Sequence, residues 1–304
     1  MKKILIASPV RQKSSILAEF LLGLDEADKG QSEVKYFFVD DNTEAASSEL
    51  LKTFAEKHDV IIEKGSDLYN ADAHYENHVW HAENLAKVTV YKNAMITHCI
   101  NYGFDYLFLI DSDIVIDKRC IPQLLSNNVD IVSNVFWNQW RKNGILTPQC
   151  FWIPDIYLQD KAFNVPMTFE EAHAIRMDMV EKMKTPGLYK VDGLGACTMI
   201  SRRALEMGVS FKEIPNLKIP GEDRPFCIRA GALGFELYMD STYPAYHISK
   251  EIYLDRVDEF KREGFKFDMC QTFEPEEPKK KHKFEFARRF LLRVGKKLVR
   301  DFSD

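Results

Sequence analysis

Short apolar runs alternate along the chain with longer segments in which apolar residues recur every three or four positions. The apolar runs predict β-strands at residues 4–7, 34–39, 60–62, 129–134 and 235–239. The recurring positions predict helices between these strands, the longest at about 84–102. Such alternation is typical of α/β proteins, in which a mostly parallel central sheet is flanked by helices.

Residues 106–116 form the longest apolar run, and they predict a central strand buried on both faces. Asp111 and Asp113 interrupt this run near its end. Residues two positions apart on a strand point the same way, so we expect both carboxylates to face one cation at the carboxyl end of the strand. Oxygen ligands favour Mg²⁺ or Mn²⁺. The pair also has a purely structural interpretation, in which Asp111 caps a turn and Asp113 is solvated.

Two further acidic pairs lie next to predicted elements. Asp40 and Asp41 directly follow the strand at 34–39. Glu222 and Asp223 precede a predicted helix, where their simplest structural role would be an N-cap pair favoured by the helix dipole. Each pair alone is a weak signal.

Two other motifs have structural and functional interpretations. Gly193 and Gly195 lack the third glycine of a dinucleotide fingerprint, and they favour close approach of the backbone to a ligand. His74, His78 and His81 have no cysteine or acidic companion pattern, which favours a polar helix or loop face over a metal site.

Charge divides the chain into an acidic body and a basic tail. Residues 279–300 contain ten basic residues and one acidic residue, a net charge of +9, which leaves −14 for the rest of a chain whose total is −5. An acidic body argues against nucleic-acid binding. Apolar positions spaced three and four apart in residues 279–300 predict an amphipathic helix. Such a helix binds an anionic membrane surface, its own domain or a second subunit.

The six cysteines are scattered, without a Cys-x-x-Cys pair, and the first apolar run is too short for a signal peptide. No segment approaches the length of a membrane span. We therefore expect reduced thiols in a cytoplasmic protein, with the basic tail as a means of peripheral attachment to the inner face of the plasma membrane.

The order of these segments resembles the nucleotide-sugar-dependent glycosyltransferases of the GT-A fold, most closely family 2. The resemblance covers residues 1–250 and implies a Rossmann-like GT-A domain, with a nucleotide-binding half at 1–115 and an acceptor-binding half at 116–250. An insertion at 151–190 would shape the acceptor site, and residues 251–304 would form a C-terminal helical extension.

The resemblance also implies a role for each matching residue. Asp223 would be the catalytic base, with Glu222 beside it. Asp113 would bind Mn²⁺ or Mg²⁺ directly, with Asp111 next to it, and His247 would either complete the coordination or serve as a core residue. The positions that would line the nucleotide-sugar site are Pro9, Val10, Arg11, Asp40, Asp41, Lys92, Asn93, Asp111, Ser112, Gly193 and Gly195.

The implied activity is metal-dependent, inverting transfer of one hexosyl or N-acetylhexosaminyl unit. A UDP-sugar is the favoured donor, and the acceptor would be a hydroxyl of a glycan, glycolipid or protein. The chain departs from the family in having Lys92-Asn93 where Arg-Asn is usual and Asn42-Thr43 where Gly-Ser is common. It also lacks the Gln-x-x-Arg-Trp motif of processive synthases, which points to transfer of a single sugar.

Three rival functions remain open. A retaining glycosyltransferase would share the metal motif. A nucleotidyltransferase normally carries a glycine-rich basic loop after its first strand, where this chain has Ser8-Pro9-Val10-Arg11. A non-catalytic sugar-nucleotide or glycan-binding module would not need the base at Asp223.

Overall fold

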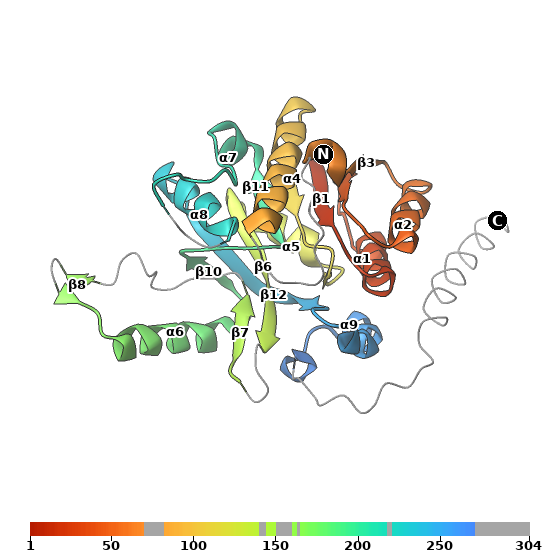
Figure 1. Ribbon diagram of the computed structural model, residues 1–304. Helices are drawn as coiled ribbons and strands as arrows, with labels where there is room; N and C mark the ends of the chain where they lie inside the picture. Colours follow the sequence, from red (N-terminus) through yellow and green to blue (C-terminus); the bar gives the residue numbers. More distant parts are fainter. Residues whose placement is uncertain (70–81, 140–143, 150–159, 163–164, 218–220, 271–304) are drawn as a thin grey trace.

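We describe the protein from a computed structural model, which places residues 1–69, 82–139, 144–149, 160–162, 165–217 and 221–270. One ten-stranded sheet forms its centre (Figure 1), and β8 (Asp160–Ala162) and β9 (Val165–Pro166) form a separate hairpin. The strands of the central sheet are β1 (Lys3–Val10), β2 (Glu33–Asp40), β3 (Val60–Lys64), β4 (Tyr106–Leu109), β5 (Ile114–Val115), β6 (Ile131–Gln139), β7 (Leu146–Gln149), β10 (Leu188–Val191), β11 (Thr198–Ser201) and β12 (Leu237–His247).

The strand order is β10-β12-β6-β11-β4-β1-β2-β3, with β5 beside β12 and β7 beside β6. Strands β3, β2, β1 and β4 are parallel to one another, and β6 is parallel to β12. Both β4 and β6 pair antiparallel with β11, so these six strands all run the same way. Only β10 and β11 oppose them along this order, which confirms the predicted mostly parallel sheet.

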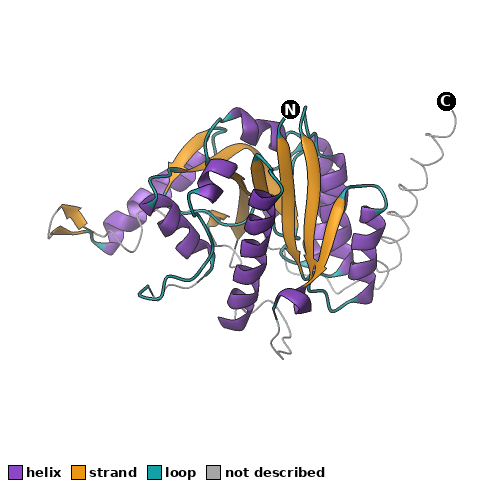
Figure 2. Cartoon of the chain, turned by 90° about the horizontal axis from the view of Figure 1, so that it is seen from above, coloured by secondary structure: helices purple, strands orange, loops and turns teal. Residues whose placement is uncertain are grey.

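Helices cover both faces of the sheet (Figure 2). The helices are α1 (Ser14–Glu26), α2 (Ala45–Ala55), α3 (Gly65–Leu68), α4 (Ala82–Asn101), α5 (Cys120–Ser126), α6 (Phe169–Met183), α7 (Arg202–Glu206), α8 (Asp223–Ala232), α9 (Val257–Glu263), and the 3-10 helices η1 (Glu251–Arg256) and η2 (Phe267–Cys270). Because side chains alternate along a strand, Ile4 and Ile6 of β1 pack with α1, α2 and α5, whereas Leu5 and Ala7 pack with α4, α7 and α8.

The segment after β12 packs on the sheet domain. Val257 and Phe260 of α9 share a buried cluster with Ile16 of α1 and Tyr246 of β12. Two ion pairs to α1 and the residue before it reinforce this contact, Lys261 Nζ to Glu19 Oε2 and Lys13 Nζ to Glu251 Oε2, each at 2.8 Å. Residues 279–300, the predicted amphipathic tail, lie outside the described residues.

Local sequence explains the start of α6 but not the segment at residues 106–116. Thr168 and Glu171 form a capping box at the start of α6, which extends away from the body with the β8–β9 hairpin (Figure 1). The single strand predicted at residues 106–116 is wrong, because β4 ends at Leu109 and a turn precedes β5. The amide of Ile114 donates to the carbonyl of Asp111 at 3.1 Å and closes this turn.

Of the remaining motifs, His74, His78 and His81 lie outside the described residues. The cysteines in the described part of the chain, Cys99, Cys120, Cys197, Cys227 and Cys270, are buried. None of the helices in the described ranges combines the length and apolar character that crossing a membrane requires.

Candidate active site

The candidate site lies where the parallel strands end. The carboxyl ends of β1, β2, β4 and β12 lead into Arg11, Asp41, the turn at Asp111–Asp113, and His247. Strand β11 runs the other way, so its first residue, Thr198, pairs with Leu109 at the same edge and brings the preceding glycine segment there. This edge of an open α/β sheet is the usual position of a ligand.

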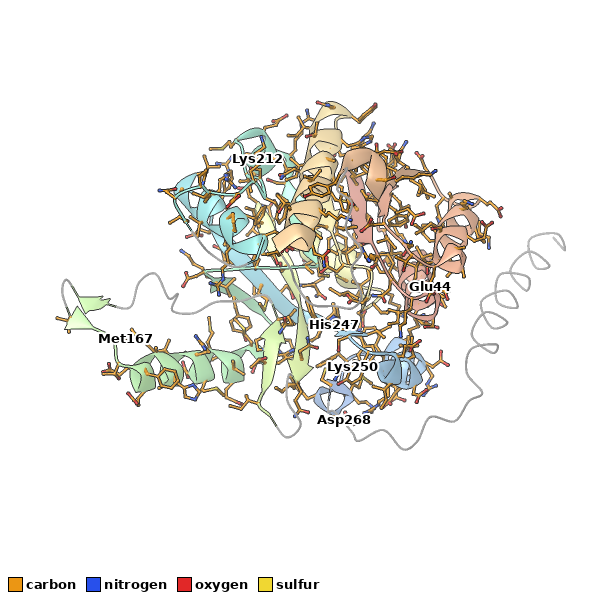
Figure 3. The ribbon with its side chains drawn as sticks, in the orientation of Figure 1. Glu44, Met167, Lys212, His247, Lys250 and Asp268 are labelled. Atoms are coloured by element: carbon orange, nitrogen blue, oxygen red, sulfur yellow. The ribbon has the colours of Figure 1, made fainter. Side chains whose placement is uncertain are left out.

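His247 joins the turn after β4 to strand β6. As the last residue of β12, His247 lies just before the segment that carries Lys250 (Figure 3). Its Nε2 is 3.4 Å from Asp113 Oδ2, and its Nδ1 is 3.0 Å from Asn138 Oδ1. Burial opposes a charge on the imidazole, but the carboxylates of Asp113 and Asp111 raise the pKa of His247 above its usual value. Asn138 therefore orients the ring, and Asp113 lies against its other nitrogen.

A second group forms where α4 faces the start of α8. Lys92 Nζ is 2.8 Å from Glu222 Oε1 and 3.1 Å from Asp223 Oδ1. The three side chains are 3%, 7% and 27% exposed, respectively, so Asp223 is the one that solvent reaches most. Glu222 occupies the N-cap position of α8 and Asp223 lies in its first turn, where the helix dipole favours a negative charge, but the Glu222 side chain makes no capping hydrogen bond.

Charge interactions set the protonation of this group. Burial would lower the pKa of Lys92, but the charges of Asp223, Glu222 and Asp111 outweigh it and hold this pKa well above its usual value. Burial, followed by the charge of Glu222, raises the pKa of Asp223 to about 7 although Lys92 opposes the shift. Burial would also raise the pKa of Glu222, but Lys92 lowers it overall. The cluster therefore contains one firmly ionised carboxylate and one that titrates near neutrality.

Asp111 interacts electrostatically with both groups, the one around Lys92 and the one around His247. Its charge raises the pKa of both Lys92 and His247. Its own pKa is raised to about 6, mainly by burial, while Lys92 opposes this shift and Asp113 adds to it. Segments more than 130 residues apart in sequence, from α4 to the end of β12, thus meet at one site.

The residues after β1 and β2 form a charged corner of the site. Arg11 Nη1 is 3.4 Å from Asp41 Oδ2, and Lys87 Nζ of α4 is 4.0 Å from Asp41 Oδ1. Asp40 instead accepts hydrogen bonds from the backbone and side-chain nitrogens of Asn42, at 3.1 and 2.7 Å. Of the two predicted aspartates, Asp41 is the one beside the basic side chains.

Several other predicted positions are held by structural contacts. The Asn93 side chain donates to the Thr89 carbonyl at 2.8 Å and accepts from the Phe211 amide at 3.0 Å. Gly193 is buried, and the next residue, Leu194, donates its amide to Cys227 Sγ in α8 at 3.1 Å.

The remaining predicted residues lie at the same edge of the sheet. Pro9 and Val10 end β1, with Pro9 paired to Val39, and Ser112 is buried in the turn after β4. The Thr198 hydroxyl donates to the Gly195 carbonyl at 2.5 Å. Binding of a nucleotide sugar by these residues stays a prediction.

The donor set suits a divalent cation shared with a ligand. Within the described ranges, no three His, Cys, Asp or Glu side chains form a ready-made metal cluster. Asp113 and His247 are nevertheless adjacent, and Asn138 orients the imidazole in the way that a partner of a metal-binding histidine does. Mg²⁺ is commonly held by one or two carboxylates and completed by substrate phosphates, so a pair of side chains fits such an ion.

Sequence reasoning missed three contributors to the site. Asn138 lies in the middle of the chain on β6, and no local pattern separates it from other strand residues. Lys87 lies in α4, and no sequence motif distinguishes it from the other polar residues of that helix. A Cβ added to Gly65 would lie 2.6 Å from Tyr91 Oη and 2.9 Å from Asp41 Oδ1, and the proximity to Asp41 follows from the pairing of β2 with β3.

Comparison with known proteins gives distant similarities only. No family model and no curated protein matches the chain. Among solved structures, S. aureus TarS residues 1–349 is 14% identical with a TM-score of 0.48, and the alignment covers 96% of this chain and 71% of that one. A longer TarS structure, also 14% identical, gives a TM-score of 0.47 and is covered over 43% of its length, against 96% of this chain.

The mannosyltransferase PcManGT from Pyrobaculum calidifontis, in complex with GDP-Man and Mn²⁺, is 10% identical with a TM-score of 0.47. The alignment covers 82% of this chain and 57% of that one. At these distances the similarities do not identify a family.

Proposed function

We propose that this chain is a glycosyltransferase that moves one sugar from a nucleotide-sugar donor to an acceptor hydroxyl, with inversion at the anomeric carbon. The observation that carries the proposal is the meeting of Asp111, Asp113, Glu222 and Asp223 around Lys92 and His247 at the carboxyl edge of the sheet. Such a site offers separate groups for the leaving diphosphate and for the acceptor proton.

Asp223 is the base in this proposal. Its carboxylate takes the proton of the acceptor hydroxyl while the acceptor oxygen forms its bond to the anomeric carbon. The bond from that carbon to the donor phosphate breaks, and the nucleoside diphosphate leaves with the electron pair. A pKa of about 7 makes Asp223 a stronger base than an ordinary aspartate while leaving much of it ionised at neutral pH.

Asp113 and His247, with Asp111 beside them, would hold Mn²⁺ or Mg²⁺. The chemistry that this ion supplies when bound is neutralisation of the charge that develops on the diphosphate. Asn138 fixes the imidazole ring, and Asp113 anchors the turn after β4 through its carbonyl, which accepts from the Ile248 amide at 2.8 Å.

Asp41 would receive the nucleotide base or ribose, with Arg11 and Lys87 beside it. The Asp41 carboxylate is an acceptor for N–H or O–H donors of the nucleoside, and the two basic side chains would offset its charge. A UDP-sugar is the favoured donor because of the family resemblance. A glycan, a glycolipid or a protein is the acceptor class.

A donor screen tests the proposal. UDP-, GDP- and dTDP-sugars are each titrated by calorimetry with Mn²⁺ or with a chelator, and hydrolysis of each donor is followed as transfer to water. We expect metal-dependent binding of one nucleotide class, weakened about 10- to 100-fold in Asp113→Ala. Asp59→Ala, which removes an exposed carboxylate paired with Lys35 away from this edge, serves as the matched control.

The same screen separates the rival functions. Absence of binding by every donor class would refute the enzyme proposal at its centre. Binding without hydrolysis or transfer to any acceptor would favour a binding module. The anomer of the product, assigned by NMR, distinguishes inversion from retention, and turnover of a nucleoside triphosphate with a sugar phosphate would indicate a nucleotidyltransferase.

A further inference from the structure

Lys92 is the most deeply buried charged group of the site. Its side chain is 3% exposed, and Nζ lies within hydrogen-bond distance of both Glu222 Oε1 and Asp223 Oδ1. The same Nζ lies 5.0 Å from the centre of the Phe211 ring. Phe211 in turn stacks on Phe226 of α8, with ring centres 4.5 Å apart. The ammonium group is therefore enclosed by two carboxylates and an aromatic ring.

A lysine that is enclosed in this way is poorly placed to bind the phosphates of the donor. An ammonium group has three N–H donors, and the two carboxylates account for two of them. A diphosphate would have to reach a nearly inaccessible Nζ and compete with two carboxylate oxygens at 2.8 and 3.1 Å. Arg11 is 34% exposed and Lys87 is 11% exposed, so both basic groups beside Asp41 are more accessible than Lys92.

We propose that Lys92 is a positioning residue for the base, which holds Asp223 and Glu222 in fixed orientations, and that it does not bind the donor phosphates. The inference rests on the proposed function of Asp223. Because Lys92 comes from α4 and the carboxylates come from the start of α8, the ion pairs fix these two elements relative to each other. The more exposed carboxylate, Asp223 at 27%, is left accessible to an acceptor, whereas Glu222 is 7% exposed.

The charge balance of the cluster suits this role. With Lys92 charged and both carboxylates ionised, the three groups carry a net charge of −1. When Asp223 accepts the proton of the acceptor hydroxyl, the net charge becomes zero, so proton transfer neutralises a buried charge. Glu222 stays ionised because Lys92 lowers its pKa.

Removing the lysine charge should therefore change the pH profile of the reaction. Among the described residues, the charges that most affect the pKa of Asp223 are those of Glu222, Lys92 and Asp111, and of these three Lys92 lowers it. Without the ammonium charge the pKa of Asp223 rises above about 7, so the acidic limb of the profile moves to higher pH. A lysine that bound only the donor phosphates would give no such shift.

The test uses the full chain and donor hydrolysis, with nucleotide affinity measured separately by calorimetry. For Lys92→Met we expect kcat to fall about 10- to 100-fold and its acidic limb to move up, while the Kd of the nucleoside diphosphate stays within about twofold of wild type. Lys92→Arg keeps the charge, and it should keep the pH profile even if its rate falls.

Lys92→Met leaves two carboxylates without their counter-charge and could fail to fold. Lys92→Met/Glu222→Gln removes one positive and one negative charge, so it should fold while still lowering kcat. Lys261→Met is the matched control, because Lys261 also lies between two carboxylates, Glu19 at 2.8 Å and Glu26 at 3.6 Å, in a contact outside the site. It should change stability alone.

The inference is overturned if the folded Lys92 variants lose nucleotide affinity tenfold while kcat and its pH profile are unchanged. It is equally overturned if Lys261→Met alters kcat as much as Lys92→Met does. If the wild-type chain binds no sugar nucleotide at all, the proposed function itself fails, and the two failures are thus distinguishable.

Discussion

The pKa of Asp223 is raised to about 7, above that of an ordinary aspartate, because burial and the charge of Glu222 oppose its ionisation. A base must be deprotonated to accept a proton, so kcat/KM should be low below pH 6, rise through about pH 7 and level off above it. A pH–rate profile of donor hydrolysis checks this. Asp223→Asn should lower the rate about 10²- to 10⁴-fold and remove the acidic limb. An acidic limb that persists in this variant would assign the titration to another group.

Asn93 provides a second test at the residue scale. Its side-chain NH₂ group donates a hydrogen bond to the Thr89 carbonyl, and its side-chain oxygen accepts one from the backbone amide of Phe211, a buried residue. Asn93→Ala should therefore lower the free energy of unfolding by about 1–3 kcal/mol and leave the nucleotide Kd unchanged.

Urea denaturation and calorimetry measure the two effects of Asn93→Ala. Thr97→Ala, on the same helix and exposed, is the control and should be nearly neutral. A large loss of nucleotide affinity in Asn93→Ala would restore the role that the family resemblance implies.

Chemistry was easier to predict than geometry for individual residues. Asp111 and Asp113 stand out because carboxylates interrupt an apolar run, and both lie at the candidate site. Their expected geometry, two side chains on one face of a strand, does not occur, because the backbone turns between them. Asp40 and Asp41 are equivalent in sequence, and the structure distinguishes them, because Asp40 accepts hydrogen bonds from Asn42 whereas Asp41 lies beside Arg11 and Lys87. The partners of Lys92, Glu222 and Asp223, lie 130 and 131 residues away, where no local pattern reveals them.

At the scale of elements, the close approach of α3 to α4 shapes the charged corner at Asp41. A Cβ added to Gly65 would lie 2.6 Å from Tyr91 Oη and 2.9 Å from Asp41 Oδ1. Tyr91 is 2% exposed and cannot move aside freely. Gly65→Ala should therefore cost about 1–3 kcal/mol of stability and also weaken nucleotide binding, because Asp41 is displaced.

Gly231 in α8 is the matched comparison, because an added Cβ meets nothing within 4 Å. Gly231→Ala should raise the free energy of unfolding by about 0.5–1 kcal/mol, since alanine loses less backbone entropy in a helix. Thermal denaturation and calorimetry on both variants measure these effects. Equal behaviour of the two variants would contradict the tight packing at Gly65.

Elements with local signals were predictable, and their junctions were not. The capping box of Thr168 and Glu171 depends on residues three positions apart, so the sequence carries all the information for it. The length of β12 depends on pairing with β6, β10 and β5, which extends the strand to His247. Tertiary pairing therefore decides that His247 ends a strand at the site.

The whole molecule explains why distant motifs meet. Six strands run in one direction, so their carboxyl ends lie along a single edge of the sheet. Each motif that directly follows one of these strands therefore lies at this edge. Strand alternation predicted this class of sheet. It did not predict that β11 runs the opposite way between β4 and β6, which brings the glycine segment to the same edge. The direction of β11 depends on long-range pairing.

The last prediction concerns the basic tail at residues 279–300, whose net charge is +9. Cys270 is buried and donates from Sγ to the Trp137 carbonyl at 3.1 Å. A chain shortened after Cys270 keeps this contact, and we expect it to keep its fold and donor hydrolysis. If the tail binds membranes, wild type should bind vesicles containing anionic lipid, and the shortened chain should not. Binding should weaken with salt, because each Lys or Arg near the surface contributes about 1 kcal/mol of attraction.

A variant with Lys279, Lys280, Lys281 and Lys283 changed to Gln separates charge from apolar contact, because it keeps the apolar positions of the tail. Vesicle sedimentation should show a large loss of binding in this variant and no change in the melting temperature. A lower melting temperature of the shortened chain, without vesicle binding by wild type, would indicate that the tail packs on its own domain. A change in oligomeric state, measured by sedimentation velocity, would instead assign the tail to a contact between two copies of the chain.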